Sequence, residues 1–117
     1  MHEHIALDIA AKAAGYQYNK QWKSYWLSSA GGSIWDGYVW RCWNPLTNNT
    51  DAFRLAVMLK LKITHQGETV TVSASDGFAV SESYKPDPLG LDALAATRRA
   101  VVQVAAYVGR EQTGGVP

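Results

Sequence analysis

The chain has 117 residues, of which 47% are hydrophobic and 18% are charged, a composition typical of one globular domain rather than of a disordered polypeptide. Its 11 Lys and Arg and 10 Asp and Glu leave a net charge of +1, which is neither the basic excess of a strong nucleic-acid binder nor the acidic excess of a DNA mimic. No apolar run approaches the roughly 20 residues that span a bilayer, and the N-terminus has no signal-peptide pattern. We therefore expect a cytoplasmic protein without a membrane partner.

The first predicted element is a helix over residues 3–14. Ile5, Ile9 and Ala13 recur every fourth residue, and Gly15 follows in the position of a helix C-cap. The apolar face of this helix is rich in alanine, which should allow it to pack closely against a sheet.

An aromatic segment follows over residues 16–43. Residues 22–27 are either a short strand or an irregular connection, and the small residues 28–33 predict a loop. Residues 38–43 alternate in the manner of a strand, which places the single cysteine, Cys42, on the face of Tyr38 and Trp40. We expect Cys42 to be a small buried side chain without reactivity. A lone cysteine also favours a reducing compartment.

The second predicted helix covers residues 50–60. Asn49 or Thr50 can supply its N-cap oxygen, and Asp51 suits its first turn. One face of this helix is apolar and is widened by two flanking residues; its members are Ala52, Leu55, Ala56 and Leu59, with Phe53 and Val57.

A hairpin is predicted over residues 61–65 and 69–75, and a third strand over 78–84. Asp87 and Pro88 then favour the start of a long helix over 89–109, which Gly109 should end. This order of elements predicts an α+β fold, with an antiparallel sheet of about four to five strands layered with three helices as an α-β-α sandwich. We expect a single domain over residues 1–110 and a disordered tail over 111–117.

No residue pattern indicates catalysis, a metal site or a cofactor. His2 and His4 stand two residues apart rather than at the spacing of zinc hydrolases, and residues two apart point to different sides of a helix. The carboxylates are explained by caps and turns or are too scattered for paired acid and base work. We therefore predict a protein that is not an enzyme.

The aromatic residues admit three interpretations. Most of them could fill the core, because each buries a large apolar area. Some could form a protein-binding surface, where Trp and Tyr are enriched. They could also stack on single-stranded bases or bind a small ligand, although stacking sites need a basic groove beside them. Our candidates for an exposed protein-binding patch are Trp22, Trp26 and Trp35, and Trp22 and Trp26 would share a side if their stretch were helical.

Three segments carry a resemblance to a known family: Trp43-Asn44-Pro45-Leu46-Thr47 followed by Asp51-Ala52-Phe53, the run Ala96-Thr97-Arg98-Arg99-Ala100-Val101-Val102, and the opening from Ile5-Ala6-Leu7 to Gly15-Tyr16. Together they resemble the phage ABA sandwich domain, a family of small proteins encoded by phages and prophages. The resemblance implies an antiparallel sheet layered with helices and a bacterial host, and it supplies no catalytic residues. Leu46 stands where the family often has Ser.

The motif formed by Trp43, Asn44, Pro45 and Asp51 also has a structural explanation, as a side-chain-capped turn that joins a strand to a helix. The resemblance implies a phage- or prophage-type accessory protein, and the aromatic residues favour one that acts by binding another protein or a second copy of itself. A small-ligand or single-stranded nucleic-acid binding module is the alternative, and an unrecognised enzyme is the least favoured.

Overall fold

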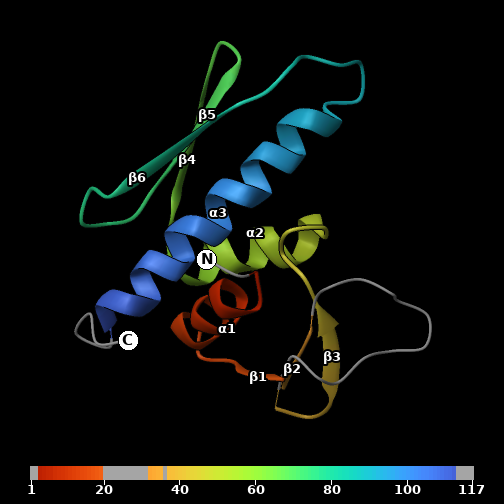
Figure 1. The fold of residues 1–117 in the computed structure, drawn as a ribbon, viewed down its shortest axis with the longest axis vertical. Coiled ribbons are helices and arrows are strands. Elements are labelled where there is room, and N and C mark those ends of the chain that lie inside the picture. The colour runs from red at the N-terminus through yellow and green to blue at the C-terminus, as the bar shows by residue number, and fades with distance from the viewer. Residues whose placement is uncertain (1–2, 20–31, 36, 113–117) are drawn as a thin grey trace.

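The computed structural model describes residues 3–19, 32–35 and 37–112 (Figure 1). Within these ranges the helices are α1 (Glu3–Ala13), α2 (Asn49–Met58) and α3 (Leu91–Gln112). The strands are β1 (Gln17–Asn19), β2 (Gly32–Trp35), β3 (Trp40–Trp43), β4 (Lys62–Gln66), β5 (Thr69–Ser73) and β6 (Ala79–Ser83). The α+β class is therefore as predicted. No helix in this part of the chain is both long and apolar enough to cross a bilayer.

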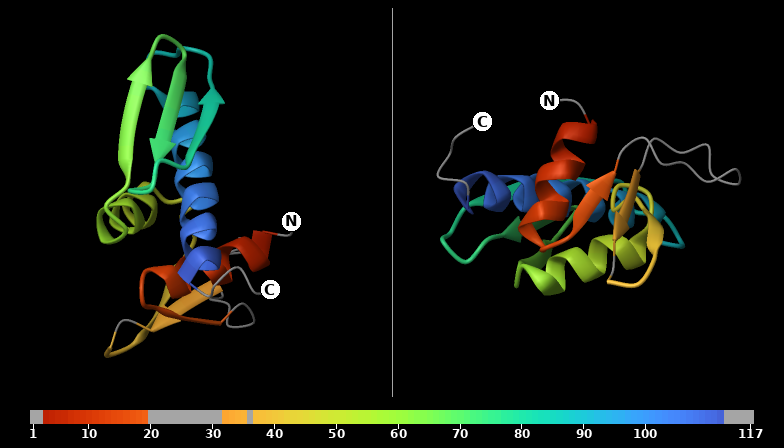
Figure 2. Two further views of the ribbon diagram at one scale, coloured as in Figure 1. Left: turned by 90° about the vertical axis from the view of Figure 1, so that its left-hand side faces the viewer. Right: turned by 90° about the horizontal axis from the view of Figure 1, so that it is seen from below.

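The strands form two sheets rather than the single sheet of four to five strands that we expected. Both sheets are antiparallel and three-stranded, in the orders β1-β2-β3 and β4-β5-β6. Because α2 directly follows β3, it carries the chain away from the first sheet before β4 begins. Figure 2 shows how the long helix α3 lies relative to the two sheets. The second sheet lies along one stretch of α3, and α1 and the first sheet lie near its C-terminal end.

The second sheet follows its predicted alternation. Val70 and Val72 of β5 are fully buried, whereas Thr69, Thr71 and Ser73 are half-buried on the other face. β5 and β6 pack against α3, so these valines form the core between sheet and helix. All five residues of β4, which lies at one edge of this sheet, are exposed.

The close crossing of α1 and α3 corrects two predictions about the end of the chain. Gly109 does not end α3, because the helix continues to Gln112 and Gly109 is buried within it. A Cβ at Gly109 would lie 2.6 Å from the backbone oxygen of Ile9, so glycine is required by the neighbouring helix rather than by a cap. Residues 111 and 112, which we had assigned to the tail, are helical, and 113–117 lie outside the described ranges.

The first sheet corrects the predictions for the aromatic segment. Gly32 and Ser33 belong to β2 rather than to a loop, while 22–27 and the rest of the predicted loop fall outside the described ranges. In β3, Trp43 is buried and Cys42 is exposed, so our assignment of the two faces was wrong. The reason is aromatic packing, since the Trp43 ring meets Tyr16 and Tyr18 edge-on at centroid distances of 6.1 and 5.9 Å.

The helix α2 buries a narrower face than we expected. Ala52, Leu55 and Ala56 are buried, but Phe53 and Val57 are 68% and 57% exposed. The two flanking residues therefore face solvent.

The starts of α2 and α3 also differ from prediction. The N-cap of α2 is Asn48, not Asn49 or Thr50. The helix α3 begins at Leu91, later than predicted. Asp87 still caps it, because its carboxylate accepts hydrogen bonds from the backbone N–H groups of Leu89, Leu91 and Asp92.

Candidate functional site

The turn between β3 and α2 is held by three side chains, each of which accepts a hydrogen bond from a backbone N–H group of the same segment. Asn44 Oδ1 accepts from the Leu46 N–H at 3.0 Å, and Asp51 Oδ2 accepts from the Asn44 N–H at 3.0 Å. Asn48 Oδ1 accepts from the Asp51 N–H at 2.9 Å. Asn44 is buried, and its backbone N–H is satisfied by a residue of the following helix. These bonds agree with the structural interpretation of the motif.

This turn fixes the position of the first turn of α2, and with it a charged pair. Burial raises the pKa of Asp51, while the Asn44 N–H and the Arg54 guanidinium act in the opposite direction. Arg54 follows Asp51 by three residues and so lies on the same side of α2. The motif therefore determines where the Arg54 side chain can reach.

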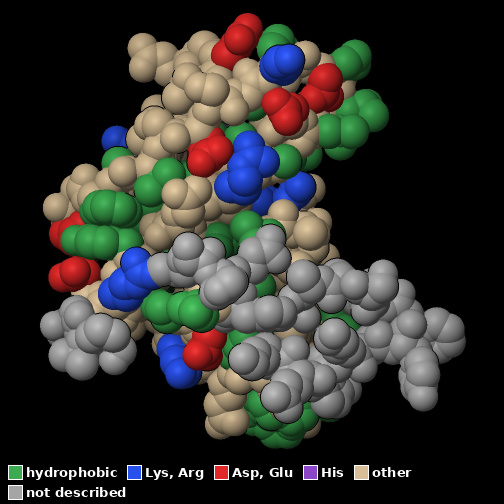
Figure 3. Space-filling view, in the orientation of Figure 1, with side chains coloured by type: hydrophobic (Ala, Val, Ile, Leu, Met, Phe, Trp, Pro, Cys, Tyr) green, Lys and Arg blue, Asp and Glu red, His purple; other side chains and the backbone are tan. Residues whose placement is uncertain are grey.

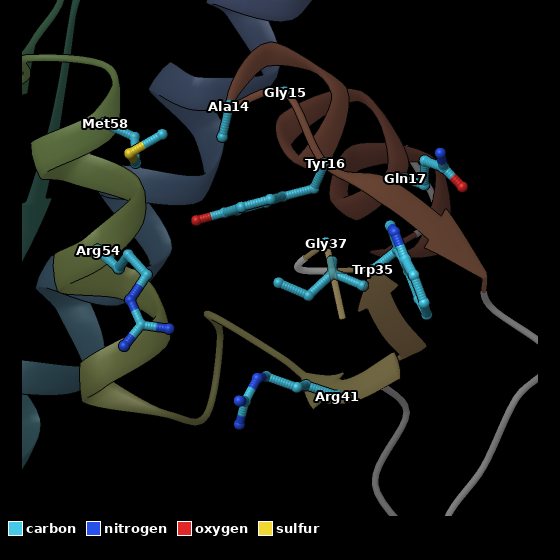
Figure 4. Close-up of a pocket in the computed structure, with 10 residues that line it drawn as sticks. Ala14, Gly15, Tyr16, Gln17, Trp35, Gly37, Arg41, Arg54 and Met58 are labelled. Carbon is cyan, nitrogen blue, oxygen red and sulfur yellow. The ribbon is translucent and has the colours of Figure 1, made fainter. Parts of the chain in front are cut away.

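Beside this turn lies an open cleft of about 700 Å³ between the end of α1, the first sheet and α2. Its functional side chains come from four different elements or their ends: Tyr16, Trp35, Arg41 and Arg54, with Gln17 and Met58 nearby. Figure 4 shows the Tyr16 ring extending from the end of α1 toward α2, while Arg54 reaches in from α2 and Arg41 from β3.

Local backbone geometry explains how Tyr16 reaches the cleft. Gly15 has a φ of 88°, a conformation that glycine adopts at little cost and that ends α1. The Tyr16 N–H then donates to the Ala11 carbonyl at 2.9 Å, which turns the chain into β1. Gly15 is thus the predicted C-cap, and it directs the first aromatic residue of the segment into the cleft.

The cleft combines positive charge with aromatic surface. Burial raises the pKa of the Tyr16 phenol; Arg54 opposes this shift and Asp51 adds to it. The phenol therefore stays protonated at neutral pH and can donate a hydrogen bond. Arg41 and Arg54 supply the two guanidinium groups that line the cleft. Phenol, indole and guanidinium together form a set suited to binding a group that carries negative charge next to apolar surface.

The cleft brings together only one of the three tryptophans proposed for a binding patch. Trp35 is half-buried at the end of β2, and its ring lies 5.8 Å from that of Trp40 across the β2–β3 pair. Trp22 and Trp26 lie outside the described ranges. The aromatic segment is therefore divided between the core, where Trp43 lies, and the surface, where Tyr38 is 87% exposed.

Sequence reasoning did not identify Tyr16, Arg41 and Arg54 as members of one site. The available signal was weak: Arg54 shares a helix face with Asp51 of the motif, and Arg41 alternates with Cys42 in β3. Among the residues that the structure places, no three His, Cys, Asp or Glu side chains come together in a way that could hold a metal ion.

Comparison of the chain with protein-family models, with curated proteins and with solved structures gives no match. The resemblance to the phage ABA sandwich domain therefore stays a prediction.

Proposed function

We propose that this chain is a prophage-type accessory protein that acts by binding another protein, and that the cleft between α1, α2 and the first sheet is its binding site. The observation that carries this proposal is the convergence of Tyr16, Arg41 and Arg54 on one open cleft, at whose margin Trp35 lies. Tyr, Trp and Arg are the residue types that most often dominate the energetics of protein interfaces.

The chemistry of the cleft defines the partner segment. Guanidinium groups bind carboxylates through paired, charge-assisted hydrogen bonds. Ile34 and Met58 line the same cleft and offer apolar surface, and Ile34 is paired with Arg41 across the β2–β3 ladder. The best fit is an acidic segment in which a carboxylate lies next to an aromatic or aliphatic residue. At about 700 Å³, the cleft can accommodate a few such side chains.

A single-stranded nucleic acid is the second candidate, because Trp35 could stack on a base while the arginines contact phosphate. Two observations weigh against it. The net charge is only +1. On the face seen in Figure 3, acidic and basic side chains are interspersed rather than gathered into one basic area. We therefore favour an acidic protein segment as the ligand.

The test is a fluorescence anisotropy titration of the full chain with a labelled peptide of alternating Glu and Phe, its Gln counterpart and an oligothymidylate. We expect the Glu peptide to bind best. Arg41→Gln and Arg54→Gln should each weaken it about 10-fold or more, because a hydrogen bond to a charged group contributes about 1.5–3 kcal/mol. Arg110→Gln, which removes the same charge on α3, should leave binding unchanged.

Two results would contradict the proposal. Equal loss of binding in Arg54→Gln and Arg110→Gln would show that only net charge matters. Tighter binding of the oligothymidylate than of the Glu peptide would favour the nucleic-acid alternative. Circular dichroism of each variant checks that its fold is intact.

A further inference from the structure

The strand β4 leaves one edge of the second sheet open. Among the described strands it pairs only with β5, and all five of its residues are exposed. The left view of Figure 2 shows β4 at one edge of this sheet, on the side of β5 opposite to β6. An open edge presents a row of backbone N–H and C=O groups that can pair with another strand.

The hairpin geometry identifies which backbone groups face outward. Gly67 and Glu68 form a two-residue loop, with a φ of 60° at Gly67, between the paired residues Gln66 and Thr69. In such a hairpin the flanking pair is hydrogen-bonded, and hydrogen-bonded pairs then alternate along the ladder. Thr64 and Lys62 therefore direct their backbone groups toward β5, whereas Ile63 and His65 direct theirs toward the open edge.

An apolar groove of about 210 Å³ lies beside this edge, between α2, β4 and α3. Its large apolar members, Phe53, Ile63 and Leu94, are 68%, 37% and 40% exposed. Val57 and Leu91 are also exposed, and each lies one helical turn from a groove residue. Contiguous apolar surface of this kind marks an interaction site.

Among the described residues that line this groove, the one basic side chain, Arg98, is already engaged within the chain. Arg98 Nε donates to the Leu46 carbonyl at 2.8 Å, and its Nη1 donates to Asn49 Oδ1. The groove therefore offers apolar surface without a charge that a partner would need to neutralise. Its occupant should itself be apolar. The same groove on a second copy of the chain meets this requirement.

We propose that the occupant is a second copy of this chain, with β4 pairing antiparallel to β4 of the other copy about a two-fold axis through Thr64. This register is the one that pairs all five residues of the strand. It forms hydrogen-bonded pairs between Ile63 and His65 of the two copies, the residues whose backbone groups face outward. The result is a continuous six-stranded sheet across two copies.

The side chains of β4 are self-complementary in this register. Lys62 lies opposite Gln66, Ile63 opposite His65, and Thr64 opposite Thr64, so no like charges face each other. A two-fold axis perpendicular to the sheet also keeps both α3 helices on the same face. The two apolar grooves then adjoin each other across the axis, and each can cover the other.

The test is the mass of the full chain in solution by sedimentation equilibrium over the micromolar range. We expect the wild type to approach twice 12.8 kDa. Thr64→Lys and Thr64→Glu should each be monomeric, because like charges would face each other on the axis. An equimolar mixture of the two variants should restore the dimer, since the introduced ammonium and carboxylate groups then face each other. Ser83 is exposed on the opposite edge strand, β6, so the variant Ser83→Lys should still form the dimer.

A second variant tests the groove separately. Phe53 is exposed in a single copy, so Phe53→Ser should weaken the dimer while leaving the circular dichroism spectrum unchanged. A wild type that stays monomeric throughout would overturn the proposal. A dimer that survives Thr64→Lys would also overturn it, as would a mixture of the two charged variants that stays monomeric. Because the cleft of Arg41 and Arg54 lies beside the first sheet, none of these results bears on peptide binding there.

Discussion

At the scale of single residues, Asp76 and Tyr107 join the turn before β6 to α3. The Tyr107 hydroxyl donates to Asp76 Oδ2 at 2.7 Å, and the Phe78 N–H donates to Asp76 Oδ1 at 2.9 Å. The rings of Phe78 and Tyr107 are stacked, with centroids 3.8 Å apart and planes 11° from parallel. The Asp76 carboxylate thus holds the turn through the Phe78 N–H, and it also holds the Tyr107 side chain, whose ring stacks on that of Phe78.

The two groups shift each other's pKa in opposite directions. The Phe78 N–H and then the Tyr107 hydroxyl lower the pKa of Asp76. The hydrogen bond to Asp76 and partial desolvation raise the pKa of Tyr107 to about 12. The contribution of Asp76 to stability is therefore present above the ordinary carboxyl pKa and is lost as the pH falls through its folded value. The contribution of Tyr107 to stability is present below about pH 10 and is lost as the pH rises through about 12.

Tyrosine titration checks this pair directly. In the wild type, the ring-carbon resonance of Tyr107, assigned with Tyr107→Phe, should titrate with a midpoint near 12. In Asp76→Asn the midpoint should fall toward the ordinary value of about 10, because the amide can still accept from Phe78 but carries no charge. Asp92→Asn, which removes a carboxylate near the start of α3, should not move it. A wild-type midpoint near the ordinary value would contradict the bond.

At the scale of secondary-structure elements, the crossing of α1 and α3 depends on small residues. Ala10, Ala11 and Ala14 of the α1 region are buried, and Gly109 of α3 faces Ile9. A Cβ at Gly109 would meet the Ile9 Cγ2 at 2.5 Å and its backbone oxygen at 2.6 Å. The backbone atom cannot rotate away, so α1 itself would have to move.

We therefore predict that Gly109→Ala destabilises the protein despite a better helix propensity. Alanine favours a helix interior over glycine by about 1 kcal/mol, but overpacking a close contact costs about 1–3 kcal/mol. The free energy of unfolding from urea denaturation should fall by up to about 2 kcal/mol. In an Ile9→Ala background the effect of Gly109→Ala should shrink without vanishing, because the carbonyl contact remains. A stabilised Gly109→Ala would show that the helices can separate without loss.

The elements themselves could be predicted from local patterns, whereas their partners could not. The alternation in β5 and the turn at Gly67 indicated the hairpin, and the Asn44 motif marked the passage from β3 to α2. Gly109 looked like a helix end because the residue that requires a glycine there, Ile9, is distant in sequence. Alternation in β3 separated two faces, but only the packing of Tyr16 on Trp43 decided that Cys42 is the outer residue.

The candidate site was less predictable for the same reason. Trp35 stood out as a large aromatic residue in a segment with weak periodicity. Arg41 and Arg54 are ordinary surface residues until β3 and α2 are placed beside each other. The number of sheets likewise depends on which strands pair, which the alternation within each strand does not specify.

At the scale of the whole molecule, α3 contacts β5 and β6 of the second sheet and also α1, which in turn contacts β1 of the first sheet. The five tryptophans all lie between residues 22 and 43, and the three that the structure describes, Trp35, Trp40 and Trp43, belong to the first sheet. The fluorescence of these three residues therefore reports on the first sheet, while far-ultraviolet circular dichroism reports on the whole molecule. This distribution makes it simple to test whether the chain unfolds as the single domain that we predicted.

We predict that Val72→Ala, a change in the second sheet, lowers the midpoints of both signals equally. Val72 is fully buried against α3, and removing its methyl groups should cost about 1–3 kcal/mol, since a single buried methylene costs about 0.5–1.5 kcal/mol. If α3 couples the two sheets, the tryptophan signal must sense this loss although Trp35, Trp40 and Trp43 belong to the other sheet. Val39→Ala, at a residue that is 49% exposed, should shift neither signal by a comparable amount. A fluorescence midpoint that stays at its wild-type value while the dichroism midpoint falls would mean that the two sheets unfold independently, and that the chain is two cooperative units joined by one helix.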